Sequence, residues 1–89
     1  MTNEQIEKFV SHKYIDVKPV QINFKTRPSI TGIFIKTHDY TELKAKNFWR
    51  IVSETNIKEW KESHDNKLAK IFCGAEFNRI TLPKQVVAV

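Results

Sequence analysis

Two His-Asp dipeptides and one cysteine carry the side chains that are first candidates for catalysis or metal binding in this chain. His38-Asp39 and His64-Asp65 each place a carboxylate beside an imidazole, an arrangement that can orient and charge a general base or bind a metal ion. Both pairs fall in polar stretches without a third ligand type nearby, so we expect solvated loop pairs and no metal site. Cys73 has no neighbouring base that would lower its pKa, so we expect a small buried strand residue rather than a nucleophile.

Other catalytic patterns are missing from the sequence. It contains no Ser/His/Asp arrangement, no paired carboxylate motif and no glycine-rich phosphate loop. A chain of 89 residues buries only about 60% of the surface that its unfolded form exposes, which argues against a deep, enclosed active site. We therefore expect no catalytic residues, no cofactor and no enzyme activity.

Positive charge is concentrated in one stretch, because residues 25–50 carry six basic and two acidic side chains within a formal net charge of +5. Cations attract a nucleic-acid backbone, and aromatic faces stack on unpaired bases. The candidate surface for nucleic acid or a protein partner consists of Lys25, Arg27, Lys36, Tyr40, Lys44, Lys46, Phe48, Trp49, Arg50 and Trp60. In the alternative interpretation the lysines only keep a small domain in solution, and Trp49 belongs to the core.

Phe48 and Trp49 are adjacent, and neighbouring residues of a regular strand point to opposite faces. Both cannot point inward. One of them is therefore expected to be exposed, or covered by the first helix, by residues 56–66 or by a partner. An uncovered aromatic residue on so small a domain would be a centre of interaction.

Hydrophobic spacing predicts the elements that position these residues. Thr2 and Gln5 have capping-box spacing, and the apolar residues after them are three and four apart, which predicts a helix at about 3–13. Alternation with a period of two predicts strands at about 19–25, 29–37, 47–53, 68–73 and 76–82.

The segments between these predicted elements show weaker hydrophobic patterns. Residues 38–42 are polar enough to be a loop or a strongly twisted connection. Asn56 and Glu59 have the spacing to cap a single helical turn that carries Ile57 and Trp60. We predict one domain over residues 1–83 and an apolar C-terminal tail at 84–89.

Gly32 and Gly74 interrupt strand patterns, and glycines in such places mark bulges or sharp bends. Five short strands with one covering helix hide their edges best in a strongly bent antiparallel barrel. The predicted fold class is therefore mainly β with an N-terminal α-helix, as a small five-stranded barrel.

This order of elements and two sets of residues resemble the Sm and Sm-like RNA-binding family. Its first motif is matched by Val20, Ile22, Gly32, Phe34, Asp39 and Tyr40, and its second by Phe72, Gly74, Phe77 and Ile80. The resemblance implies a helix followed by a bent five-stranded barrel, and chains that join edge to edge into rings. Glu42 stands where the family has an asparagine, and Cys73 where it has an arginine, and those two residues help to hold a base. The family's base pocket is therefore not expected here.

Two functions remain open. One is a non-enzymatic binding module that uses a barrel edge and an aromatic, basic face for a protein partner or for further copies of itself, as a homo-oligomer. The alternative is binding of RNA or single-stranded nucleic acid through the surface of residues 25–50. A polar N-terminus, no apolar run of about 18 residues and a single cysteine predict a cytoplasmic protein without membrane association.

Overall fold

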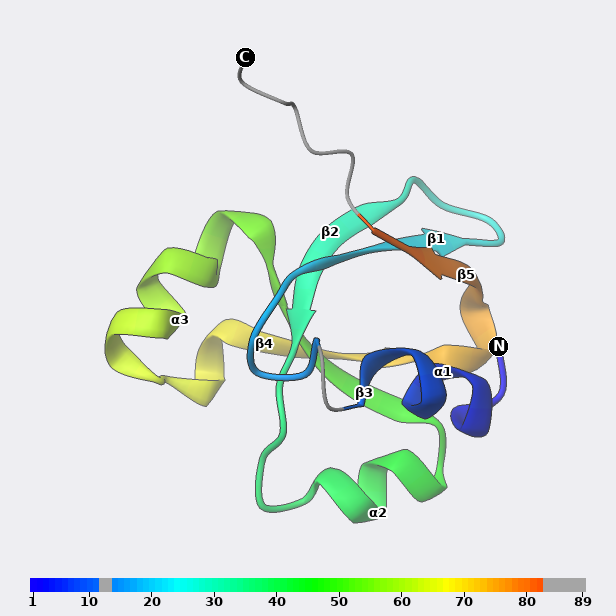
Figure 1. Cartoon of the computed structure of the whole chain (residues 1–89), viewed down its shortest axis with the longest axis horizontal. Helices are drawn as coiled ribbons and strands as arrows, with labels where there is room; N and C mark the ends of the chain where they lie inside the picture. Colours follow the sequence, from blue (N-terminus) through cyan, green and yellow to red (C-terminus); the bar gives the residue numbers. More distant parts are fainter. Residues whose placement is uncertain (12–13, 83–89) are drawn as a thin grey trace.

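The computed structural model describes residues 1–11 and 14–82 (Figure 1). Its helices and strands are α1 (Asn3–Val10), β1 (Val20–Phe24), β2 (Ile30–Phe34), α2 (Tyr40–Ala45), β3 (Phe48–Ser53), α3 (Ile57–Ser63), β4 (Ala69–Cys73) and β5 (Phe77–Thr81). The first helix and all five strands lie within the ranges that the sequence predicts. The predicted tail at 84–89 lies outside the described residues.

The start of α1 follows from its first residues. Thr2 Oγ1 accepts the backbone N–H of Gln5 at 3.2 Å, and the Gln5 side chain accepts the N–H of Thr2 at 3.0 Å. This capping box satisfies two donors that a helix end otherwise leaves free. Ile6 and Val10 form the buried side of the helix. A helix of eight residues is too short to be stable alone, so packing against the sheet must hold it.

The five strands form one antiparallel sheet in the order β4-β3-β2-β1-β5. The predicted fold class is confirmed in its main features: a mainly β domain, an N-terminal helix and five antiparallel strands. β4 and β5 are the two ends of the sheet, and among the described residues each pairs with one neighbouring strand. Closure of the sheet into a barrel therefore stays a prediction.

The sheet is strongly curled. Phe72 of β4 and Phe24 of β1 belong to strands with β3 and β2 between them, yet their ring centroids are 5.9 Å apart. In a flat sheet three strand spacings would separate them by about 14 Å. Phe77 of β5 packs edge to face on Phe24 and on Phe34 of β2. Both ends of the sheet thus contribute aromatic rings to the same interior.

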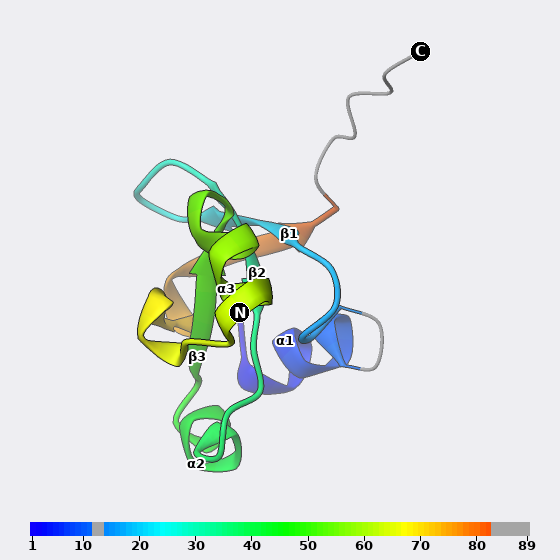
Figure 2. The ribbon, with the colours of Figure 1, turned by 90° about the vertical axis from the view of Figure 1, so that its left-hand side faces the viewer.

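Both faces of the sheet are covered, because α1 and α3 pack in different cores; α3 and α1 lie on different sides of β2 in Figure 1, and α3 lies in front of β2 in Figure 2. The larger core, which includes α1, consists of Ile6, Val10, Val20, Ile22, Phe24, Phe34, Trp49, Ile51, Phe77 and Ile80. A smaller cluster joins Ile33, Ile35 and Val52 to Trp60 of α3. Because side chains on both faces are covered, the consecutive residues 32–35 are all buried.

Both glycines lie where the backbone comes close to other atoms. A Cβ on Gly32 would lie 2.7 Å from Ile51 Cγ2 and 2.8 Å from the carbonyl oxygen of Val52, so a side chain would push β2 and β3 apart. Gly74 begins the 3₁₀ helix η3 (Gly74–Glu76) that links β4 to β5. A Cβ there would overlap Asn47 Oδ1 and lie 2.5 Å from a methyl carbon of α1.

Two connections differ from the prediction. Residues 38–42 were expected to form a loop or a strongly twisted connection, but Tyr40 begins α2 and packs edge to face on Trp49 with 6.0 Å between the ring centroids. The segment after β3 forms a seven-residue helix instead of a single turn, because Trp60 anchors α3 in the smaller core. In both cases a tertiary contact of an aromatic ring stabilises a helix that is marginal by itself.

Candidate binding edge and groove

The aromatic and basic residues predicted as one surface do not form one. Trp49 and Trp60 are 2% and 5% exposed, so the prediction that they belong to a binding surface is wrong. Trp49 fills the larger core and donates its indole N–H to Asn47 Oδ1 at 2.9 Å, whereas Trp60 packs in the smaller core. The physical reason is that a domain of this size needs its largest apolar side chains inside. Phe48 is the exposed member of the adjacent pair, at 37%.

Arg50 is paired with an acid. Its Nη2 and Nε donate to the carboxylate of Asp39 at 2.7 and 3.2 Å, and the hydroxyl of Thr37 donates to the same carboxylate. The bonds from Arg50 and then from Thr37 hold the pKa of Asp39 well below its usual value, and Asp39 raises the pKa of Arg50. Arg50 thus ties the start of α2 to β3 and is not a free cation for phosphate.

A second cluster consists of Lys36, Tyr40 and Lys44. The ammonium of Lys44 donates to Glu7 of α1, and this bond raises the pKa of the lysine. Lys36 Nζ and Lys44 Nζ lie 5.4 and 5.6 Å from the centroid of the Tyr40 ring. Burial raises the pKa of the Tyr40 phenol, and Glu7 adds to the shift. These contacts join α1 to α2, so the charges are partly satisfied within the protein.

Three predicted cations lie apart from these clusters. Lys25 and Arg27 are exposed in the connection between β1 and β2, and Lys46 is exposed after α2. Of the ten predicted residues, the structure brings Arg27 and Phe48 to one feature, the edge of β4 with the groove beside it. That groove and the edge next to it are the candidate binding site.

The edge of β4 that faces away from β3 is open. In an antiparallel pair, alternate residues exchange both hydrogen bonds with the partner strand, and the residues between them point their groups away. The N–H of Gly74 donates to the carbonyl of Asn47 at 2.8 Å, which fixes this alternation along β4. By this alternation the N–H and C=O of Ile71 and the N–H of Cys73 point outward. In the described part of the chain β4 pairs with β3 alone, so these groups can pair with another strand.

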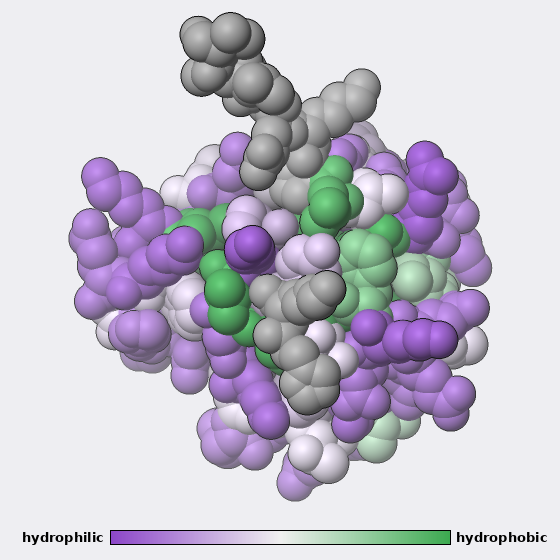
Figure 3. Space-filling model, viewed as in Figure 1, coloured by the Kyte–Doolittle hydropathy of each residue, from purple (hydrophilic) through white to green (hydrophobic). Residues whose placement is uncertain are grey.

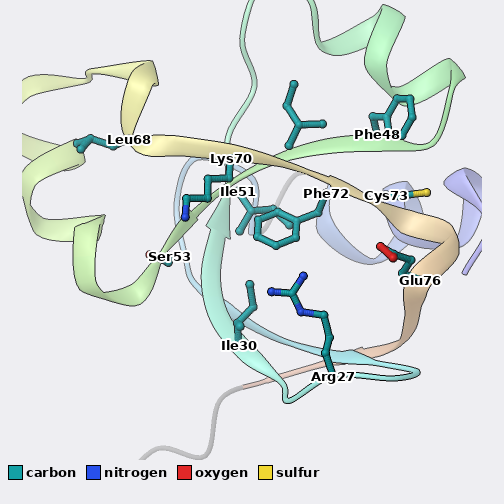
Figure 4. A pocket seen from close by; sticks show the side chains of 11 residues that line it. Arg27, Ile30, Phe48, Ile51, Ser53, Leu68, Lys70, Phe72, Cys73 and Glu76 are labelled. Atoms are coloured by element: carbon teal, nitrogen blue, oxygen red, sulfur yellow. The ribbon is translucent and has the colours of Figure 1, made fainter.

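The groove has a volume of about 550 Å³ and runs along this edge (Figure 4). In the close-up, Phe72 and Ile51 point from β4 and β3 towards Ile30 and Arg27, which belong to the hairpin of β1 and β2. The apolar floor is bordered by the polar side chains of Arg27, Ser53, Lys70 and Glu76. An added strand would therefore meet apolar contacts below and charged groups at the border.

Arg27 covers an aromatic pair at this groove. Its guanidinium carbon lies 4.8 Å from the centroid of the Phe24 ring and 5.9 Å from that of Phe72. Neither of the two ion pairs among the described residues includes Arg27 or Lys70. The aromatic faces hold the guanidinium in place, and its N–H donors, which belong to no ion pair within residues 1–11 and 14–82, can bind an anionic group.

The other face of β3 and β4 exposes apolar side chains. Phe48 pairs with Cys73 and Arg50 with Ile71, so Phe48 and Ile71 are diagonal neighbours on one face. Ile71 is 51% exposed. Cys73, a free thiol, is half-buried beside them. On the face that Figure 3 shows, hydrophilic residues dominate the border of the view and hydrophobic ones gather towards its middle.

Sequence reasoning missed most of this site. Lys70, Ile71, Phe72 and Glu76 line the groove or the edge, but none of them was predicted as a binding residue. The alternation of Lys70 and Phe72 does indicate that they share one face of a strand. The sequence does not reveal that β4 is an edge strand, because the order of the strands in the sheet depends on the fold.

The His-Asp pairs have structural contacts. Asp39 bonds to Arg50, and the backbone N–H of Lys67 donates to Asp65 at 2.9 Å. His64 packs edge to face on Trp60 with 5.3 Å between ring centroids. Among residues 1–11 and 14–82, no group of three or more His, Cys, Asp or Glu side chains could hold a metal ion.

No protein-family model matches the chain, and no curated protein or solved structure matches it either. The helices of the described segments have eight residues or fewer, and none has the length and apolar character to cross a membrane. The geometry of the β4 edge is thus the basis for a functional proposal.

Proposed function

We propose that this domain is a non-enzymatic binding module that adds an extended strand of a protein partner to the open edge of β4. The observation that carries the proposal is that the outward N–H and C=O groups of Ile71 lie beside a groove of about 550 Å³. In strand addition, backbone hydrogen bonds supply affinity, and pockets for alternate side chains supply specificity. The β4 edge offers both the outward backbone groups and a groove for side chains.

The two faces of β3 and β4 also favour the addition of a strand. Side chains of an added strand would point alternately into the groove, beside Phe72, and onto the exposed face, beside Ile71 and Phe48. Burial of Ile71 and Phe48 removes apolar surface from water, which stabilises the complex by about 25 cal/mol per Å² before the cost of ordering is subtracted.

The likeness to Sm-like proteins belongs to this proposal. An opening helix, five antiparallel strands and a strongly curled sheet support it. In this version the curled sheet stays open between β4 and β5, and the strand added to β4 is β5 of a second copy in a head-to-tail assembly. The proposed compartment is the cytoplasm, where a lone thiol such as Cys73 stays reduced.

Binding of RNA or single-stranded nucleic acid is the second candidate. The exposed cations Lys25, Arg27 and Lys70 favour it, because none of them belongs to an ion pair among the described residues. Lys44 and Arg50, which the sequence assigned to the nucleic-acid surface, are paired with Glu7 and Asp39. The protein-strand proposal therefore has the stronger support.

A neutral strand-forming peptide tests the proposal. We expect the capped heptapeptide Ac-Thr-Val-Thr-Val-Thr-Val-Thr-NH2 to shift the backbone amide signals of Ile71 and Cys73 when titrated into isotope-labelled protein. Ile71→Pro should abolish the shift of the Cys73 amide, because proline removes the outward N–H of residue 71, and an edge strand tolerates proline. Ile71→Thr keeps that N–H and is the matched control, with binding weakened but present. Unchanged amide signals at millimolar peptide would contradict the proposal.

A further inference from the structure

We infer that the strand accepted by the β4 edge is acidic, so that the occupant is an acidic segment of a protein partner and not a second copy of this chain. The inference rests on the proposed function and adds the chemistry of the partner. Its evidence is the placement of charges around the groove and at the two ends of the sheet.

Two cations lie where a strand would be added. Lys70 is in register with Ile51, which lines the groove, so its side chain is on the groove side of β4 together with that of Phe72. Arg27 reaches the same groove from the opposite hairpin, over the Phe72 ring. A groove-facing side chain of the partner beside Lys70 would therefore meet two positive charges that have no acidic partner among the described residues.

A glutamate fits this position best. Its methylene groups can lie on the Phe72 ring, and its carboxylate can accept two parallel bonds from the guanidinium of Arg27. The next residue of the partner points to the other face, where exposed Ile71 and Phe48 favour an apolar side chain. The preferred partner thus alternates acidic and apolar residues.

Glu76 sets the position of the acid along the edge. It borders the groove beyond the Cys73 end of β4, whereas Lys70 lies near the start of the strand. A carboxylate next to Glu76 would be repelled, and one next to Lys70 attracted. We therefore expect the acidic residues of the partner to lie beside the first half of β4.

The charges oppose a second copy at the same place. The other end of the sheet is β5, which carries exposed Arg79, and exposed Lys25 follows the neighbouring strand β1. Pairing β5 of another copy with β4 would bring Arg79 to an edge that already carries Lys70 and Arg27. Like charges close together across a strand pair are destabilising, and the net charge of +5 on each chain adds repulsion.

The test compares three capped heptapeptides that differ only at their third and fifth residues. They are the neutral Ac-Thr-Val-Thr-Val-Thr-Val-Thr-NH2, the acidic Ac-Thr-Val-Glu-Val-Glu-Val-Thr-NH2 and the basic Ac-Thr-Val-Lys-Val-Lys-Val-Thr-NH2. Titrations followed by amide shifts should give the acidic peptide an affinity about tenfold higher than the neutral one, and the basic peptide the lowest affinity. The advantage of the acidic peptide should shrink as salt is added.

Charge reversal identifies the cations responsible. Lys70→Glu and Arg27→Glu should each remove most of the acidic preference, and both together should favour the basic peptide. Lys58→Glu is the matched control, since it makes the same change in net charge at an exposed position of α3. It should leave the order of affinities unchanged.

The outcomes separate this inference from the proposed function. Equal binding of acidic and neutral peptides, abolished in both cases by Ile71→Pro, would overturn the acidic partner and leave strand addition standing. Failure of all three peptides to bind would overturn both. Sedimentation showing a dimer that Ile71→Pro dissociates and Lys70→Glu does not affect would assign the edge to a second copy. Displacement of the acidic peptide by a ten-nucleotide uridine RNA, with RNA binding lost in Lys70→Glu, would assign the groove to nucleic acid and overturn the inference.

Discussion

Gly74→Ala is expected to destabilise the corner that connects the two ends of the sheet. A Cβ at this position would overlap Oδ1 of Asn47, lie 2.8 Å from its Cγ and lie 2.5 Å from Cδ1 of Ile6. The side-chain oxygen of Asn47 is the acceptor for the indole N–H of Trp49, and its amide donates to the carbonyl of Met1 at 2.9 Å. One methyl group would therefore displace the residue that joins the N-terminal segment, β3 and η3.

Two contributions determine how much Gly74→Ala lowers the free energy of unfolding. Crowding against Ile6 of α1 is an overpacking of a filled core, which costs about 1 to 3 kcal/mol. Displacement of Asn47 leaves the buried indole N–H of Trp49 without its acceptor, which costs about 1 to 3 kcal/mol more. The sum is about 2 to 6 kcal/mol, against a free energy of unfolding of about 4 to 13 kcal/mol for a domain of this length. We expect the variant to be folded only marginally.

Urea unfolding followed by tryptophan fluorescence measures the effect. The midpoint should fall by at least about 1 M, given a urea dependence of about 1 to 2 kcal/mol per M for a small domain. Asn47→Gly, at a backbone φ of 61° that suits glycine, removes two of the three closest contacts, so Gly74→Ala should cost less in that background. Ala75→Ser, at the exposed neighbouring position, is the control and should change stability by less than about 0.5 kcal/mol. A wild-type midpoint for Gly74→Ala, or an equal cost with and without Asn47, would refute the reasoning.

Three further changes test other parts of the structure. Gly32→Ala should be at least as damaging as Gly74→Ala, because one of its closest neighbours is backbone that no side-chain change can remove; a higher urea midpoint for Gly32→Ala than for Gly74→Ala would contradict this. Asp39→Asn should lower the urea midpoint at neutral pH, and the difference from wild type should shrink as the pH falls from about 4 to about 2. The pKa of Asp39 is depressed in the folded state, so its pair with Arg50 stabilises the fold fully above the unfolded pKa and loses this contribution progressively as the pH falls towards the depressed pKa. A constant difference between variant and wild type across this range would be evidence against the pair. Trp60→Phe should be less destabilising than Trp49→Phe by about 1 to 3 kcal/mol, because the Trp60 indole N–H is buried without an acceptor among the described residues whereas that of Trp49 is hydrogen-bonded. Equal losses in thermal melts would contradict the contrast.

Local patterns in the sequence predict the strands well, most clearly for β1, in which buried residues alternate with half-buried ones. Thr2 and Gln5 likewise mark the start of α1, since a capping box is a local interaction. The helix α2 could not be predicted in this way. It depends on Tyr40 packing on Trp49, which the chain brings together only after β2 and β3 have paired.

The candidate site was harder to predict because it depends on which strands lie at the ends of the sheet. Alternation indicates that one of Phe48 and Trp49 faces outward, and the structure shows that it is Phe48. The sequence does not reveal that Arg50 has an acidic partner eleven residues earlier, so it counted as a free cation. Nor does it reveal that Arg27 crosses to the aromatic ring of a strand more than forty residues later in the chain.

Lys70 affects both the protection of this edge against unwanted pairing and the kind of strand that the edge binds. An open strand edge is a template for unwanted pairing, and a lysine on the edge opposes the approach of another neutral or basic strand. In this chain the same lysine stands beside a groove that a second cation, Arg27, also reaches. A strand that brings its own carboxylates meets attraction in place of repulsion, and it covers Phe48 and Ile71 at the same time. Replacing Lys70 by a neutral residue should therefore have two effects together, a weaker preference for acidic strands and a greater tendency of the protein to associate with itself at high concentration. Loss of the acidic preference without increased self-association would show that the charge selects the partner but does not protect the edge.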